Sequence, residues 1–168
     1  EDKVFILMRS VHHQFAKRLM ELFPYDRNKF LTISRNRYIE STKLIADIFK
    51  GEIQGRRLLT FSPYPSKRGF FTFHSFLSAE DDFAEIISAK LTHTPKEVLK
   101  ALAEAKTPYS DEDPEVQRAY DEEARQAYKE LTEKEAFVED YFNKEIKISL
   151  DYLQMISIKQ LKAYMKQK

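Results

Sequence analysis

The chain has 168 residues, of which 42% are hydrophobic, including 13 Phe and 9 Tyr. This is enough apolar material to build the core of a folded domain, which excludes a disordered chain. Lys and Arg number 28 against 27 Asp and Glu, so the charge balance predicts no nucleic-acid partner and no anionic membrane surface. The absence of cysteine excludes disulfides and thiolate metal sites, which leaves His, Asp and Glu as the expected metal ligands.

The start of the chain and its longest apolar run set the expected organisation. Residues 4–8 form that run and are too short to cross a bilayer, so no transmembrane segment is predicted. The chain begins at Glu1 rather than at Met, as expected of a mature chain or of a piece of a longer one. We expect a single domain over residues 1–168, with a sub-boundary near the polar linker at 107–114 if it divides.

The first predicted element is a helix from Val4 to Phe23, because apolar residues recur there at helical spacing. Such a stripe is typical of a well-buried helix, and Pro24 ends it. The residues of the stripe are Leu7, Val11, Phe15, Leu19 and Phe23.

The next part of the chain contains the only predicted β structure. Residues 30–34 are expected to form a short strand or a tight loop, and residues 38–49 a helix that Gly51 ends. Two β-rich runs follow, at 57–62 and 69–76, and either pair as a β-hairpin with a long tip or remain extended loops.

The remainder of the chain is predicted to be helical. Ser78 can cap a helix that runs from Glu80 to Leu91, and Thr94 with Pro95 opens another that runs to about Lys106. Three further helices are expected at 115–131, at 135 to about 147, and at 150–166. The predicted fold class is therefore α+β and mainly helical, with one short β-hairpin or extended segment.

The first predicted helix carries the sequence VHHQFAK at residues 11–17, which resembles a degenerate His-Glu-x-x-His zinc signature. In the intact motif two His at i and i+4 bind one zinc ion, and the Glu is the general base for the metal-bound water. His13 keeps the first ligand position, whereas Gln14 stands at the general-base position and Lys17 at the second ligand position. Half a motif also arises by chance, so this segment carries little weight alone.

A second segment strengthens the resemblance. Residues 69–75 (GFFTFHS) followed by residues 80–87 (EDDFAEII) resemble the "GFVTPYA … EDFAEI" stretch of a family of bacterial zinc metallopeptidase-like lipoproteins. That family is distantly related to the lethal-factor type of zincin. Residues 30–38 and 138–153 also resemble it, so the resemblance spans nearly the whole chain, without the family's N-terminal part. It implies a zincin-like C-terminal portion.

The resemblance implies a role for each matching position. The family's third zinc ligand, a Glu, falls on Asp81, and the Glu that supports a ligand His falls on Glu85. The Tyr that faces the reacting carbonyl, and so stabilises the transition state, falls on His74, with the spacing of seven to Asp81 kept.

The replacements at these positions weaken the expected zinc chemistry. A catalytic zinc needs three protein ligands and an open position for water. Lys17 supplies a positive charge in place of a lone pair, and Asp81 is one methylene shorter than Glu. Gln14 cannot accept a proton, and the loss of a general base typically costs about 10²–10⁴-fold in rate. We therefore expect a pseudoenzyme without a cofactor, and zinc only if the site functions.

Two rearrangements of this site remain open. Lys17 could form a salt bridge with Asp81 or Glu85 and so fill the vacated metal position. Alternatively, His74 and His13, with or without His12, could bind a metal in a different geometry. For each of these His residues, a hydrogen-bonded imidazole without a ligand role is the simpler interpretation.

Three functions are consistent with the sequence. The first is an inactive metallopeptidase-like domain that binds a peptide or protein at the cell envelope, in the periplasm or anchored to the outer membrane. The resemblance suggests an outer-membrane import complex as its setting. The second is an active zinc-dependent hydrolase with atypical ligands, which predicts zinc bound by His13 and Asp81. The third is a helical interaction module unrelated to peptidases, which would place these two residues on distant faces.

Two other features receive the simplest interpretation. Arg56, Arg57, Lys67 and Arg68 stand among aromatic residues and could bind phosphate, but such a cluster is usually a solvated hairpin. His93, just before the Thr94 cap, is expected to be an exposed loop residue without a role.

Overall fold

The computed structural model describes residues 2–35, 37–38 and 59–166, which form helices and connecting loops with no strand among them. The predicted helix at 38–49 lies almost wholly outside these residues. The elements are α1 (Asp2–Leu22), α2 (Arg27–Ile33), α5 (Pro63–Ser66), the 3-10 turn η1 (His74–Phe76), α6 (Ala79–Thr92), α7 (Pro95–Lys106), α8 (Pro114–Tyr141), the π-helical turn η2 (Phe142–Ile146) and α9 (Leu150–Met165). None of these helices is long and apolar enough to span a membrane.

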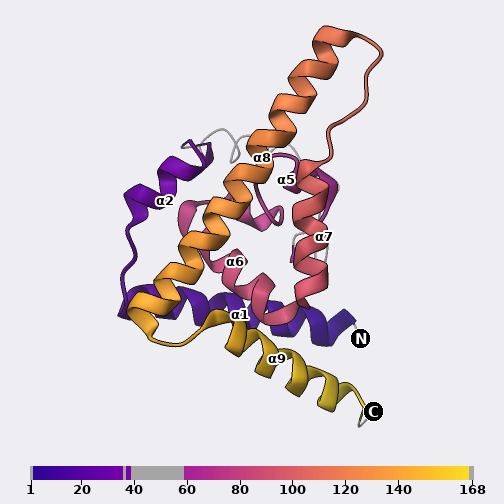
Figure 1. Cartoon of the computed structure of the whole chain (residues 1–168). Coiled ribbons are helices and arrows are strands. Elements are labelled where there is room, and N and C mark those ends of the chain that lie inside the picture. Colours follow the sequence, from indigo (N-terminus) through magenta and orange to yellow (C-terminus); the bar gives the residue numbers. More distant parts are fainter. Residues whose placement is uncertain (1, 36, 39–58, 167–168) are drawn as a thin grey trace.

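Helix α6 is the centre of the arrangement. It packs against α1, α8 and α9, while α7 packs against α8 (Figure 1). The N-terminal part of α8 projects beyond the other helices, and α1 and α9 lie at the opposite end of the molecule (Figure 1).

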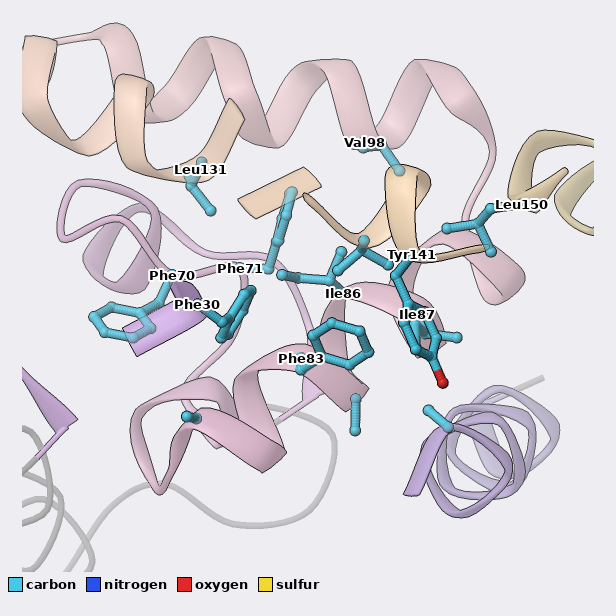
Figure 2. Close-up of a cluster of buried hydrophobic side chains, with 14 of the residues drawn as sticks. Phe30, Phe70, Phe71, Phe83, Ile86, Ile87, Val98, Leu131, Tyr141 and Leu150 are labelled. Carbon is cyan, nitrogen blue, oxygen red and sulfur yellow. The ribbon is translucent and has the colours of Figure 1, made fainter. Parts of the chain in front are cut away.

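The hydrophobic core forms around α6. Phe83, Ile86 and Ile87 are fully buried, and aromatic rings from α2 and α8 close around them (Figure 2). Phe30 lies edge-on to Phe83 with ring centroids 5.3 Å apart, and Tyr141 lies edge-on to it at 5.2 Å. Burial of each such ring contributes about 1.5–3 kcal/mol, so this cluster fixes α6 in place.

The predicted β-hairpin is wrong, and with it the α+β fold class. Residues 63–66 form the short helix α5, with Pro63 at its first position. Phe70, Phe71 and Thr72 are all buried, although three consecutive residues cannot face one side of a half-buried strand. The segment is instead an irregular chain packed on all sides. Residues 57 and 58 of the predicted first strand lie outside the described residues.

The expected strand or tight loop at 30–34 is also wrong, because helix α2 covers most of it. The Asp26 side chain accepts a hydrogen bond from the Lys29 backbone N–H at 3.0 Å, which caps the helix start. This short helix directs Phe30 into the core.

The helices predicted at 80–91, from Pro95 to about Lys106, and at 150–166 are confirmed as α6, α7 and α9. The predicted separation into 115–131 and 135–147 is wrong, because α8 continues without a break from Pro114 to Tyr141. The polar residue between the two predicted helices, Lys134, is fully buried. Its ammonium group donates to the Gly69 carbonyl oxygen at 2.6 Å, so its polarity marks a buried contact rather than a loop.

The first helix is confirmed as α1, but the face that it buries is not the predicted one. Leu7, Val11 and Phe15 are 61%, 50% and 43% exposed, and we call this exposed row the α1 ridge. The buried face carries Arg9 and His13 instead. Periodicity identified an apolar stripe correctly, yet α6 packs against the opposite face of α1, where Arg9 and His13 find ionic partners.

Candidate functional site

Small residues bring α1 and α6 close together at the site. Ala16 on α1 and Ala84 on α6 are both fully buried, which allows the two backbones to approach. The Ser88 hydroxyl donates to the Arg9 carbonyl oxygen at 2.7 Å and fixes the register of the two helices. One face of α1, with His13 and Lys17, therefore lies opposite the first turns of α6.

Asp81 is positioned by the cap of α6. The Ser78 hydroxyl accepts a hydrogen bond from the Asp81 backbone N–H at 3.0 Å and donates to Asp81 Oδ2 at 2.7 Å. The other carboxylate oxygen, Oδ1, lies 2.6 Å from Lys17 Nζ and 3.5 Å from His13 Nε2. Burial raises the pKa of Asp81, but hydrogen bonds from His13, Lys17 and Ser78 outweigh it and lower the pKa below its ordinary value.

His13 lies between the two carboxylates of α6. Its Nδ1 is 2.8 Å from Glu85 Oε1, while its Nε2 faces Asp81. Burial lowers the pKa of His13, but the hydrogen bonds and charges of Asp81 and Glu85 outweigh burial and raise the pKa above its ordinary value. The charged form of this imidazole is therefore favoured, whereas a metal ligand must present a neutral nitrogen.

Glu85 is fully buried and is surrounded by donors. Arg9, also fully buried, donates from Nη2 to Glu85 Oε2, and the Thr72 hydroxyl donates to the same oxygen at 2.8 Å. Burial raises the pKa of Glu85, but Arg9, His13 and His74 together lower it below its ordinary value. The sequence analysis missed Arg9, although it lies four residues before His13 and therefore on the same helix face.

The remaining predicted site residues differ in their placement. The His74 ring stacks on His13 with ring centroids 4.7 Å apart, and its Nδ1 lies 3.4 Å from Glu85 Oε1 without hydrogen-bond geometry. Gln14 is exposed on α1. The structure thus brings His13, Lys17, Asp81, Glu85 and His74 together. The helical-module alternative required His13 and Asp81 to lie on distant faces, and that condition is not met.

Three residues are close enough to hold a metal ion. Ligand atoms of His13, His74 and Glu85 all lie within 4.8 Å of one another. A metal bound there would take Glu85 Oε1 from His13, whose Nδ1 lies 2.8 Å from it, and would lie beside the Arg9 guanidinium that Oε2 of the same carboxylate holds, so the two positive charges would repel each other.

At the position expected for zinc, the donor set is also unsuitable. The Lys17 ammonium group already contacts Asp81 Oδ1, and Ser78 occupies Oδ2. A dication about 4 Å from an ammonium group would be repelled by roughly 8 kcal/mol at an effective dielectric of about 20. The residues present therefore do not fit a catalytic zinc ion.

The other two His residues belong to different surroundings. His12 Nδ1 lies 2.9 Å from the Thr92 hydroxyl, about two turns along α6 from Glu85, and burial with the charge of Arg9 lowers the pKa of His12 to about 4. His93, predicted to be exposed, is only 7% exposed and stacks on Phe61 with ring centroids 4.3 Å apart. The ring contact at the end of α6 explains this burial.

Comparison with protein families gives a match over most of the chain. Residues 1–151 match the model of a family described as "Putative zinc-binding metallo-peptidase". Searches among curated proteins and among solved structures give no match.

Proposed function

The chain belongs to this metallopeptidase family, and from that premise we propose that it is a metallopeptidase-like domain with an ion pair in place of its zinc site. It binds a peptide or protein partner without cleaving it. The observation that carries the proposal is the 2.6 Å contact between Lys17 Nζ and Asp81 Oδ1. The ammonium group satisfies the carboxylate that would otherwise bind the metal, so a positive charge fixed to the chain takes the place of the ion.

The residue at the general-base position supports the same proposal. Gln14 can donate and accept hydrogen bonds, but its amide has no basic site with which to remove a proton from water. Hydrolysis of a peptide bond at such a site requires another base. Glu85 does not serve, because Arg9, Thr72 and His13 bind its carboxylate and keep it buried.

The binding part of the proposal is supported by the α1 ridge. Leu7, Val11 and Phe15 are exposed on the same helix that carries His13 and Lys17. Contiguous exposed apolar side chains are typical of surfaces that contact a protein or peptide. The ridge lies on the side of α1 opposite His13, so it would offer a partner an apolar surface separate from the ion pair.

The decisive experiment measures zinc in the protein purified without chelator and titrates the protein with zinc by calorimetry. We expect no stoichiometric zinc in the unmodified chain. The triple variant Gln14→Glu, Lys17→His, Asp81→Glu rebuilds the intact motif and should gain a zinc site. Lys129→His, at an exposed position near Glu133, is the matched control and should not gain one. Stoichiometric zinc together with peptide hydrolysis by the unmodified chain would overturn the proposal.

The second candidate function is a zinc-dependent hydrolase with atypical ligands. It is favoured by the His13, His74 and Glu85 cluster alone. If that candidate were correct, His74→Ala would remove the bound zinc and the activity, whereas Lys17→Met would preserve both. The inactive domain predicts that neither variant changes the metal content.

We also propose the cell envelope of a bacterium as the setting, through the resemblance to lipoproteins. A partner in an outer-membrane import complex would suit this setting. Fractionation of cells that produce the full-length protein tests it, and recovery in the cytoplasmic fraction alone would contradict it.

A further inference from the structure

A cavity lies in another part of the molecule, away from the contact between α1 and α6. It has a volume of about 600 Å³ and lies between α8 and the loops that flank α2 and α5. Arg35, Arg37, Lys67 and Arg68 contribute to its lining, together with the rings of Phe70 and Tyr109. None of these residues belongs to the site described above, so the cavity has a chemistry of its own.

One buried carboxylate holds two of these cations. Glu130 is fully buried, and Arg35 Nη2 lies 3.0 Å from its Oε1 while Arg37 Nη2 donates to its Oε2. Arg35 has a left-handed backbone with φ of 51°, which is uncommon for a residue other than glycine. A single negative charge therefore serves two guanidinium groups, and the contacts fix their positions at the cavity wall.

The other two cations are held mainly by neutral groups. The Lys67 ammonium group donates to the Thr107 carbonyl oxygen and lies 4.6 Å from the centre of the Tyr109 ring, with Glu104 Oε1 at 3.7 Å. The Arg68 guanidinium lies 3.8 Å from the centre of the Tyr64 ring and donates to the Tyr64 carbonyl oxygen at 3.3 Å. Among the described residues, Arg68 has no carboxylate partner within ion-pair distance. Arg68 is therefore positioned by neutral groups, and Lys67 by neutral groups with a loose ion pair.

The acidic residues of the cavity limit the charge of its ligand. Glu122 and Glu123 line the α8 side, and Glu122 already pairs with Arg125 at 2.7 Å. A polyanion such as a nucleic acid would be repelled by them, whereas a single anionic group could reach the basic wall. Arg56 and Arg57 of the predicted phosphate cluster lie outside the described residues.

We propose that this cavity binds a small organic molecule through one carboxylate or phosphate group. Guanidinium groups present paired N–H donors that match both kinds of anion. Within the described part of the chain Arg68 has no carboxylate within ion-pair distance, and the Glu104 carboxylate lies 3.7 Å from Lys67. The Tyr109 ring, which is 41% exposed, contacts the apolar part of the ligand. The cavity volume lies within the range of small-molecule sites.

Calorimetry or ligand-observed NMR at low ionic strength tests this site with benzoate, benzamide and inorganic phosphate. Benzoate and benzamide have similar shapes, so their difference isolates the charge. We expect benzoate to bind at least about tenfold more tightly than benzamide, because charge-assisted hydrogen bonds are lost with the neutral amide. Phenyl phosphate, which keeps the ring of benzoate, completes the set, and its ranking against benzoate tells whether the site prefers a carboxylate or a phosphate.

Two variants and one control locate the binding. Arg68→Gln and Lys67→Gln should each weaken benzoate binding by about tenfold, whereas Lys129→Gln removes the same charge from an exposed position of α8 and should change nothing. Circular dichroism verifies that each variant is folded. Equal binding of benzoate and benzamide would overturn the proposal, as would saturable binding that survives both variants. If none of the anions bound at about 10 mM, the proposal would be overturned as well.

Discussion

Asp81 and Asp82 are neighbours in the sequence, yet they form ion pairs in opposite surroundings. Asp81 faces α1 and pairs with Lys17 at 2.6 Å, where the two side chains are 18% and 32% exposed. Asp82 faces α8 and pairs with Lys134 at 2.7 Å, where both side chains are fully buried. The contact distances are almost equal, but only the first pair can be reached by water.

Burial decides how much each ion pair contributes to the stability of the fold. Burial raises the pKa of Asp82 and lowers that of Lys134, so the charged pair is held against a large cost of removing it from water. The pKa of Asp81 is lowered, because its donors outweigh its partial burial. The comparison teaches that the Asp82 pair is part of the framework between α6 and α8. The Asp81 pair lies at a place where side chains can be exchanged at little cost.

Removal of Lys134 should break the framework pair and produce the largest effect. Lys134→Met leaves the Asp82 carboxylate buried with the Tyr38 hydroxyl at 2.6 Å as its remaining close donor. We expect the free energy of unfolding to fall by about 3–5 kcal/mol in urea denaturation. Lys129→Met should change it by less than about 0.5 kcal/mol. If Lys134→Met lowered the free energy of unfolding as little as Lys129→Met does, the Asp82 pair would contribute no more to stability than an exposed residue.

The pH dependence of stability sharpens the comparison, because His93 is buried and its ion pair with the exposed Glu97 side chain is loose, with Nδ1 3.8 Å from Oε2. Burial and the charge of Arg9 lower the pKa of His93 to about 4 from 6.5. Between these values the unfolded chain binds more protons, so stability falls as pH falls from about 6.5 to 4. The loss is on the order of 3 kcal/mol for this group.

Urea denaturation at several pH values measures this effect. His93→Gln should flatten the acid side of the stability curve, and the remaining slope in the same window is expected from His12, whose pKa is also about 4. An unchanged curve in His93→Gln would show that His93 is protonated in the folded chain.

Removal of Arg9 tests whether Glu85 depends on one partner or on several. Arg9→Met leaves Glu85 with donors from His13 at 2.8 Å and Thr72 at 2.8 Å. We therefore expect a loss of about 2–3 kcal/mol, smaller than for Lys134→Met, because the carboxylate keeps two hydrogen bonds. A loss as large as that of Lys134→Met would mean that these two bonds contribute little.

The smallest effect on stability is expected for the partly exposed pair of Lys17 and Asp81. Lys17→Met should lower the free energy of unfolding by less than about 1 kcal/mol, since partly exposed ion pairs contribute little. Thermal unfolding of this variant beside Lys129→Met measures it. A loss above about 3 kcal/mol would show that Lys17 is a structural residue, comparable to Lys134.

Local signals in the sequence predicted much of the helical architecture. Ser78 and the Thr94–Pro95 pair marked the starts of α6 and α7, because caps act over a few residues. The structure places His13, Lys17, Asp81, Glu85 and His74 close together, an arrangement that the resemblance implied. Their roles stay predictions, because they derive from the resemblance.

The failures concern contacts between distant segments. The buried Lys134 and Arg9 resemble surface residues in the sequence, because their partners Asp82 and Glu85 stand far away along the chain. Periodicity found the α1 ridge but could not tell which face α6 covers. The segment at 70–73 has the composition of a strand, but among the described residues no neighbouring segment pairs with it in a sheet.

Gly69 lies against Glu130 and Arg37, the buried carboxylate and one of the cations at the wall of the cavity of about 600 Å³. Its φ is +77°, and a Cβ atom there would lie 3.1 Å from Glu130 Cβ and 3.2 Å from Arg37 Nη2. An added methyl group would be strained by this φ and would force the Glu130 and Arg37 side chains to shift, which would disturb the ion pairs of Glu130 with Arg35 and Arg37. We therefore expect that only glycine is tolerated at position 69. A single added carbon atom there would displace Arg37 and Glu130, which lie more than thirty positions away on either side in the sequence.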